Sequence, residues 1–205
     1  PNGLIYLDGV YHMFYQYNPA EPNWENMHWG HAESRDLIHW EEKDTALFPD
    51  KRGVMFSGCA VLDDKNLLGK NNGNNKCALL FYTTTNPFCQ QMSYSVDNFK
   101  SIIPYGEKPV VPHIIEANRD TKVIFCDEIG CYIMVLYLTK DNYCIFKSDD
   151  LIEWEEIQQM QIQGDNECPD IFPLCDSEGN RKWIIMGAHE KYLVGKFEDG
   201  KFVAE

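Results

Sequence analysis

The residues best suited to chemistry surround Glu167, in the stretch Gly-Asp-Asn-Glu-Cys-Pro-Asp of residues 164–170. Pro169 fixes its own φ and biases Cys168 toward extended geometry, so we expect the Glu167 side chain to be aimed from the start of a strand. A carboxyl group held against sulfur and apolar neighbours has its charged form disfavoured, which favours proton donation. An isolated Glu-Cys-Pro is more often a surface glutamate before a strand, so support must come from elsewhere in the chain.

The elements that would position Glu167 follow from an internal repeat of short β-rich runs. Four times, one run leads through an acidic or glycine-containing turn into a second, which is the pattern of a β-hairpin. The paired runs are residues 3–8 and 11–16, 59–63 and 78–83, 122–127 and 132–137, and 170–176 and 183–186. The Asn-rich stretch between the second pair is therefore a hairpin loop and not a linker.

A second repeat follows three of these hairpins. Residues 34–42 resemble residues 148–156, and a weaker copy begins at Ser95, so the leading serines are 61 (95 − 34) and 53 (148 − 95) residues apart. Repeats of about 50 residues with two hairpins each predict an all-β fold, a β-propeller with four-stranded blades. The chain would cover about three blades and the start of a fourth. We therefore expect residues 1–205 to be an incomplete propeller catalytic domain whose start and end are missing.

The first strand of every propeller blade lines the central axis, so residues just before those strands should meet in space. In successive repeats these residues include Asn2, Ser57, Asp120 and Glu167. Two carboxylates in a sugar-sized pocket indicate glycoside hydrolysis, in which one is the acid and the other a nucleophile or base. We expect Asp120 to stay ionised, because the adjacent cation of Arg119 lowers a carboxyl pKa. Glu167 is then the better proton donor.

Aromatic side chains could supply the apolar floor on which a sugar ring rests. Trp24, Trp29 and Phe56 are candidates. Core packing explains Trp29 slightly better than ligand binding does. Trp24 lies in a polar loop rich in Pro and Asn, where packing explains it less well.

Composition limits the other classes of partner. The net charge is −14 and the basic residues are scattered, which argues against nucleic acid. No run of about 18 apolar residues occurs, so no membrane span is expected. The eight cysteines form no Cys-x-x-Cys pair and several lie in strand-like runs, which predicts buried thiols, no zinc site, and a cytoplasmic rather than secreted location.

Six short motifs occur in a fixed order: Pro1-Asn2-Gly3, Gln16 to Pro19, Trp24 to His31, Phe56-Ser57-Gly58, Arg119-Asp120 and Glu167 to Asp170. Together, and across essentially all 205 residues, they resemble glycoside hydrolase family 32, which contains invertases, levanases and inulinases. The resemblance implies a five-bladed β-propeller followed by a β-sandwich.

The resemblance also implies roles for individual residues. Glu167 would be the general acid/base, and Cys168 beside it would help to keep it protonated. Asp120 would bind fructose hydroxyls and stabilise the transition state, and Arg119 would hold Asp120 and contact the acid. The residues that would contact the substrate are Asn2, Gln16, Trp24, Phe56, Ser57, Arg119 and Cys168.

The family's nucleophile is an aspartate directly before Pro-Asn-Gly, so it is expected one step upstream of Pro1 and outside the sequence. Without it, we expect the segment by itself to hydrolyse nothing. Three residues next to the motifs differ from the family's usual ones. Cys59 and Thr121 are expected to tune the site, and Asn166 could alter leaving-group recognition.

The sequence thus predicts a retaining glycoside hydrolase that releases terminal β-fructofuranosyl units from fructans and sucrose, with no metal or organic cofactor. A fructosyltransferase and a non-catalytic carbohydrate-binding propeller remain as alternatives. The partner would be a fructose-containing oligosaccharide or polysaccharide, and the oligomeric state is left open.

Overall fold

A computed structural model describes residues 2–73 and 75–205, so Pro1 of the first motif lies outside the described residues. All the regular elements in those two ranges are β-strands, which confirms the prediction of an all-β fold. No helix long and apolar enough to cross a membrane occurs among the described residues.

The strands form four-stranded antiparallel sheets in which every strand pairs with its neighbour in sequence. The first two sheets contain β1 (Gly3–Leu7), β2 (Val10–Tyr17), β3 (His28–Ser34) and β4 (Glu41–Glu42), then β5 (Met55–Leu62), β6 (Ala78–Thr85), β7 (Phe88–Ser95) and β8 (Ile103–Pro104). The next two contain β9 (Arg119–Cys126), β10 (Cys131–Thr139), β11 (Asn142–Ser148) and β12 (Glu155–Gln161), then β13 (Asp170–Cys175), β14 (Arg181–Met186), β15 (Tyr192–Glu198) and β16 (Lys201–Ala204). Each sheet is an up-and-down meander of the kind found in a propeller blade.

The four hairpins predicted from the sequence open the four sheets, as β1–β2, β5–β6, β9–β10 and β13–β14. The shortest turn, between β1 and β2, has both its residues at positive φ, Asp8 at 50° and Gly9 at 84°. Glycine adopts such angles without steric cost, and aspartate tolerates them better than most residues. The local sequence is therefore sufficient to define these hairpins.

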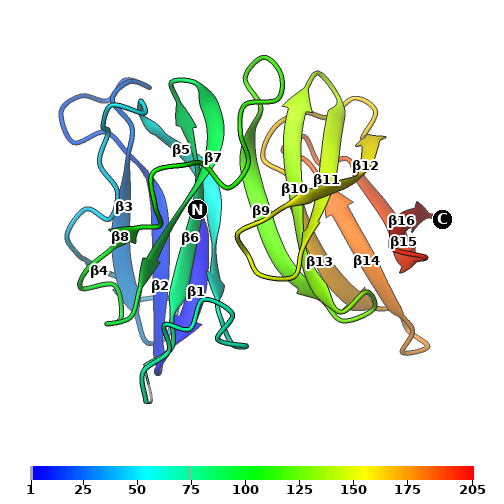
Figure 1. Ribbon diagram of the computed structural model, residues 1–205, viewed down its shortest axis with the longest axis horizontal. Coiled ribbons are helices and arrows are strands. Elements are labelled where there is room, and N and C mark those ends of the chain that lie inside the picture. Colours follow the sequence, from blue (N-terminus) through cyan, green and yellow to red (C-terminus); the bar gives the residue numbers. More distant parts are fainter. Residues whose placement is uncertain (1, 74) are drawn as a thin grey trace. The chain divides into compact units, whose positions relative to one another are not determined.

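The chain divides into two compact units, which are described separately. The first ends at His113 and contains the two sheets β1–β4 and β5–β8; the second, residues 114–205, contains β9–β12 and β13–β16 (Figure 1). In the first unit β1 contacts β5, and in the second β9 contacts β13. Within each unit, the strands that open neighbouring sheets therefore lie side by side.

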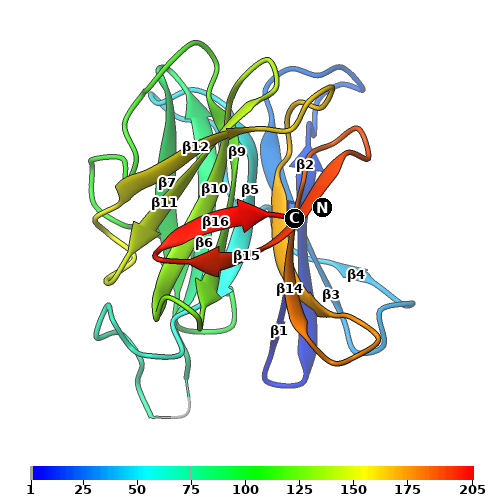
Figure 2. The same ribbon diagram turned by 90° about the vertical axis from the view of Figure 1, so that its right-hand side faces the viewer.

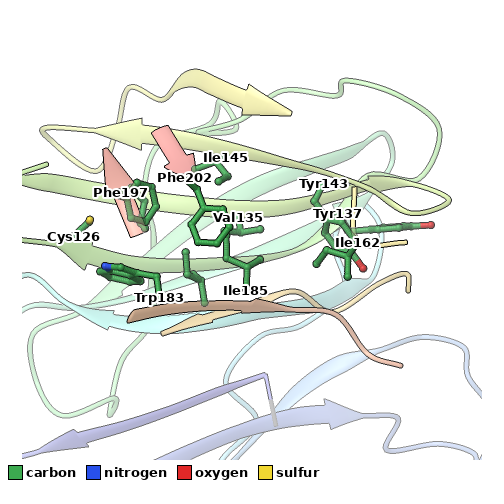
Figure 3. Close-up of a cluster of buried hydrophobic side chains, with 12 residues drawn as sticks. Cys126, Val135, Tyr137, Tyr143, Ile145, Ile162, Trp183, Ile185, Phe197 and Phe202 are labelled. Carbon is green, nitrogen blue, oxygen red and sulfur yellow. The ribbon is translucent and has the colours of Figure 1, made fainter. Parts of the chain in front are cut away.

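Aromatic and branched side chains fill the space between the two sheets of the second unit. Trp183 and Phe197 of one sheet lie with Val135 and Ile145 of the other in a cluster of buried residues (Figure 3). The rings of Trp183 and Phe197 meet edge to face, with centroids 5.4 Å apart. Burying each such side chain contributes roughly 1.5–3 kcal/mol. This packing fixes β9 against β13; Asp120 lies on β9, and Glu167 lies three residues before β13 begins.

The second sequence repeat is also a structural repeat. Ser34 Oγ accepts a hydrogen bond from the backbone N–H of Leu37 at 2.9 Å, and Ser148 Oγ accepts one from Leu151 at 2.8 Å. The weaker copy at Ser95 forms the equivalent bond one residue later along the chain. Serine oxygens satisfy backbone donors in this way at tight turns.

The fourth sheet is more complete than the sequence predicted. The sequence predicted that the fourth unit would end as its second hairpin begins, near Phe202, but the chain continues through β15 into β16 (Figure 2). Phe202 of β16 pairs with Phe197 of β15. The described residues thus contain four four-stranded sheets, rather than three and the start of a fourth. The last strand is only four residues long, and so short a run gives little periodic signal. A total of five blades stays a prediction.

Candidate active site

Asp120 lies at an irregular point near the start of β9. Between the pairs Lys122–Val135 and Arg119–Tyr137, β9 has one residue more than its partner β10, which defines a β-bulge. Asp120 has φ 64°, an uncommon angle for a residue other than glycine. Bulges re-aim side chains and occur often beside active sites.

The Asp120 carboxylate is buried, with 6% of the residue exposed. Its Oδ2 accepts hydrogen bonds from the backbone N–H of Cys168 at 3.1 Å and from the Cys168 thiol at 3.5 Å. Burial raises the pKa of Asp120, and the Cys168 N–H and the Arg119 charge oppose this rise without cancelling it. Arg119 does lower the pKa of Asp120, as expected, but the expectation of a net lowering was wrong, because it ignored the cost of taking a carboxylate out of water.

Arg119 contacts four residues of the site. Its Nη1 donates to the carbonyl of Ala117 at 2.7 Å, and its guanidinium lies 4.8 Å from the ring centroid of Tyr137. Its Nη2 donates to Glu167 Oε1 at 2.6 Å, while Nε lies 3.6 Å from Asp120 Oδ2. A guanidinium fixed in this way brings the two carboxylates to one place although they are 47 positions apart (167 − 120) in the sequence.

Glu167 lies in the loop between β12 and β13, directly before Cys168 and Pro169. Glu167 has φ 58° and Cys168 has φ 38°, so the extended geometry expected for Cys168 was wrong. The Glu167 carbonyl accepts a hydrogen bond from the Tyr143 hydroxyl at 3.4 Å. The Glu167 side chain is 47% exposed, so its carboxyl group is accessible to a ligand.

Cys168 contacts Asp120 through both its N–H and its thiol. The residue is exposed overall, and its sulfur lies 3.5 Å from Asp120 Oδ2. The loss of water around the thiol, together with the charge and hydrogen bond of Asp120, raises the pKa of Cys168 to about 12. Cys168 is therefore a neutral hydrogen-bond donor to Asp120 and not a nucleophile.

In the first unit, two of the predicted site residues, Gln16 and Ser57, contact the buried Asn2. In the orientation that satisfies both ends of its amide, Asn2 donates to Ser57 Oγ at 3.1 Å and accepts from Gln16 Nε2 at 2.9 Å. Its oxygen also lies 3.0 Å from the indole nitrogen of Trp29, which is fully buried, as core packing predicts. Ser57 occupies a β-bulge of β5, opposite the step from Thr83 to Tyr82.

Three aromatic rings lie near this group in the first unit. Phe56 is half-buried, and its ring centroid is 6.1 Å from that of Trp24 and 6.0 Å from that of Phe88. Trp24 is 63% exposed, which is unusual for so large an apolar ring. These rings offer an accessible apolar surface. That this group around Asn2 and the carboxylates Asp120 and Glu167 line one funnel stays a prediction.

One group of described residues has the composition of a metal site. Ligand atoms of His12, His31 and Glu33, in the first unit, all lie within 4.8 Å of one another. The two imidazoles face each other, with His12 Nδ1 and His31 Nε2 3.0 Å apart, ring centroids 5.3 Å apart and planes inclined by 21°. Two nitrogens bound tetrahedrally to zinc would be about 3.4 Å apart, with lone pairs that converge on the ion. The observed geometry is that of a hydrogen bond.

Sequence reasoning missed three residues that shape the carboxylate site. Tyr137 and Tyr143 looked like ordinary members of apolar runs, and nothing in the pattern distinguished their polar ends. Asp165 lies in the same stretch as Glu167, so a signal was present. Its structural role depends on partners more than 20 residues further along the chain.

Comparison with known proteins supports the resemblance found in the sequence. The model of the glycosyl hydrolases family 32 N-terminal domain matches residues 1–205. Levanase from Bacillus subtilis (strain 168) is 35% identical over 225 residues, a match that covers all of this chain and 33% of the levanase.

Two solved structures extend the comparison to the fold. Exo-inulinase from Aspergillus awamori matches with a TM-score of 0.87 at 29% identity, over all of this chain and 48% of that one. A fructofuranosidase from Schwanniomyces occidentalis complexed with fructose matches with a TM-score of 0.88 at 28% identity, over all of this chain and 45% of that one. The chain thus spans a third of the levanase and less than half of either solved enzyme. It belongs to glycosyl hydrolases family 32, in the region of that family's N-terminal domain.

Proposed function

We propose that the protein containing this chain is a retaining β-fructofuranosidase that releases terminal fructosyl units from fructans and sucrose. The observation that carries the proposal is the accessible Glu167 carboxyl group, which Arg119 holds beside the buried Asp120. Fructans and sucrose are proposed as substrates because the similar proteins are a levanase, an exo-inulinase and a fructofuranosidase.

In the proposed first step, Glu167 donates a proton to the leaving oxygen as the bond to the anomeric carbon breaks. Arg119 binds Oε1 of Glu167, so the donated proton would come from Oε2. The nucleophile, an aspartate expected upstream of Pro1, would form the new bond to that carbon. In the second step Glu167 takes a proton from water, whose oxygen displaces the nucleophile and releases fructose. The chemistry uses two carboxylates and no cofactor.

Asp120 would accept hydrogen bonds from fructose hydroxyls. The N–H and thiol of Cys168 already bind Oδ2 of Asp120 and fix the carboxylate's orientation. Hydrogen bonds to a sugar hydroxyl can strengthen as the transition state forms. We assign Asn2, Gln16 and Ser57 of the first unit to polar contacts with the substrate, and Trp24 and Phe56 to its apolar face.

The test replaces Glu167 with Gln in the protein that contains this chain. Turnover of sucrose and levan should fall by about 10²–10⁴-fold, because proton donation is lost. Glu178→Gln, in the exposed turn between β13 and β14, is the matched control and should retain wild-type turnover. Wild-type rates in Glu167→Gln would refute the assignment.

Product analysis separates the proposed function from its two alternatives. A hydrolase releases free fructose from sucrose, whereas a fructosyltransferase extends sucrose to longer oligosaccharides. A non-catalytic binding protein would retain fructan without forming either product. Preference for phosphorylated sucrose over levan, inulin and sucrose would refute the proposed substrate class.

A further inference from the structure

We infer that Asp165 is a positioning residue for Glu167, because it ties the loop that carries this glutamate to the loop between β14 and β15. The inference rests on the proposed role of Glu167 as the proton donor. Asp165 precedes Glu167 by two residues and belongs to the same unit.

The Asp165 carboxylate is enclosed by backbone N–H groups. The residue is 2% exposed, and its Oδ1 accepts from Asn166 at 2.7 Å and from His189 at 2.8 Å. Its Oδ2 accepts from Lys191 at 2.9 Å. One side chain therefore binds three donors, one in its own loop and two in a loop more than 20 residues later.

The same connection is reinforced from the backbone. The N–H of Ala188 donates to the carbonyl of Asn166 at 3.3 Å, which again joins the two loops. The Asp165 N–H in turn donates to the carbonyl of Ile162 at 3.0 Å and closes the turn that precedes Glu167. These bonds leave the segment before Glu167 little freedom to shift.

Glu167 needs such support because its own backbone is unfavourable. Positive φ at both Glu167 and Cys168 persists only where the surroundings determine it. Tyr143 holds the Glu167 carbonyl from one side, and the cap at Asp165 holds the preceding residues. The direction in which the carboxyl group points thus depends on Asp165.

A charged carboxylate is required for this cap. Burial opposes the charge of Asp165, but the hydrogen bonds from His189, Lys191 and Asn166 outweigh it and lower the pKa. An asparagine of the same size has only one acceptor oxygen, so it cannot satisfy donors on both sides of the carboxylate. Asp165→Asn should keep the volume and loosen the loop.

Gly187 offers a second way to disturb the same contact. A Cβ atom at this position would lie 2.5 Å from Asp165 Oδ1 and 2.4 Å from the Tyr143 hydroxyl oxygen. Real Cβ atoms do not approach other atoms so closely, so Gly187→Ala must displace Asp165, Tyr143 or both. Both of these residues hold the segment that carries Glu167.

Asp176 provides a matched control within the same sheet. Its Oδ1 accepts from the N–H groups of Glu178 at 3.0 Å and Asn180 at 2.8 Å, so it caps the turn between β13 and β14. It is the same residue type with the same kind of partners, at a turn that does not carry Glu167. Because both backbone donors bind Oδ1, Asp176→Asn should lose only the bond from the Asn180 side-chain amide to Oδ2 and leave the acid undisturbed.

The experiment compares two substrates with the protein that contains this chain. Sucrose has a poor leaving group that needs a proton, whereas p-nitrophenyl β-D-fructofuranoside has a good one that needs little help. For Asp165→Asn and for Gly187→Ala we expect kcat/KM on sucrose, which reports the step in which Glu167 acts as the acid, to fall by about 10–100-fold, since a misplacement near 1 Å has a cost of this order. The loss on the aryl substrate should be at least several-fold smaller, and Asp176→Asn should match wild type on both.

Circular dichroism checks that each variant is folded. If Asp165→Asn does not fold, Gly187→Ala still tests the positioning role. Equal losses of kcat/KM on the two substrates, or wild-type kcat/KM in a folded variant, would overturn the positioning role while the proposed function stands. A wild-type protein that hydrolyses neither substrate would instead overturn the proposed function, and this inference with it.

Discussion

Protonation of His31 should destabilise the first unit in acid. His31 is 3% exposed, its Nε2 lies 3.0 Å from His12 Nδ1, and its ring stacks on Phe14 with centroids 4.7 Å apart. Burial and the neighbouring His12 lower the pKa of His31 from 6.5 to about 4, and Glu33 opposes this less strongly. Protonation of His31 is therefore disfavoured, because its charge would be removed from water and would lie beside another imidazole.

The size of the effect follows from linkage. Because the folded state binds the proton less tightly than the unfolded state, the neutral His31 contributes stability above pH 6.5, and this contribution is lost as the pH falls from 6.5 toward 4. At ~1.4 kcal/mol per pH unit, the loss reaches about 3 kcal/mol near pH 4. That is a sizeable fraction of the stability of a typical domain.

The assay is denaturant unfolding of the wild type and of His31→Gln between pH 7.5 and pH 4. Carboxylates titrate in both proteins, so their effects cancel when the free energy of unfolding of His31→Gln is subtracted from that of the wild type. This difference should shrink by about 3 kcal/mol between pH 7.5 and pH 4. His39→Gln is the control: His39 is exposed and its Asp36 partner raises its pKa, so its contribution has the opposite sign. A difference between wild type and His31→Gln that stays constant with pH would refute the argument.

Three further predictions concern the site. Arg119→Met removes the donor to Glu167 and the cation beside Asp120, so kcat should fall by about 10–100-fold. Because Arg119 restrains the raised pKa of Asp120, the acidic limb of the kcat/KM profile should also move to higher pH. An unchanged acidic limb would contradict this. The Cys168 thiol, with its pKa raised to about 12, should react with iodoacetamide at pH 8 at least ~100-fold more slowly in the folded than in the unfolded protein, as peptide mass spectrometry can measure. Gly58→Ala would place a Cβ atom 1.9 Å from a carbonyl oxygen of β6. The substitution should therefore destabilise the protein by about 1–3 kcal/mol or prevent folding. A melting temperature equal to that of the wild type would refute the close approach.

The hairpins and the carboxylate pair could be predicted from the sequence because the fold repeats. Strand pairing within a hairpin is local, and residues such as Asp8 and Gly9 mark the turn. In a repeat fold, residues at equivalent positions of successive repeats also occupy equivalent places in the structure. For this reason Asp120 and Glu167, although distant in sequence, could be expected at one place, and the structure has Arg119 in contact with both.

The last strand and the backbone of the site could not be predicted with the same rules. Four residues of β16 are too few to show a period, although their pairing with β15 is regular. The bulges at Ser57 and Asp120 add one residue to a strand without any change in composition. The register mismatch is visible only when both strands of the pair are seen together.

The remaining features depend on tertiary structure because they arise from burial and from partners distant in sequence. Residue types alone place a cation beside Asp120 and so suggest a lowered pKa, but the packed site removes water from the carboxylate and raises it instead. The sequence likewise contains Asp165 and does not indicate that it caps N–H groups at 189 and 191. The sequence determined which residues could act. The folded chain decided how far each one is exposed to solvent, which partners it binds and the direction in which it points.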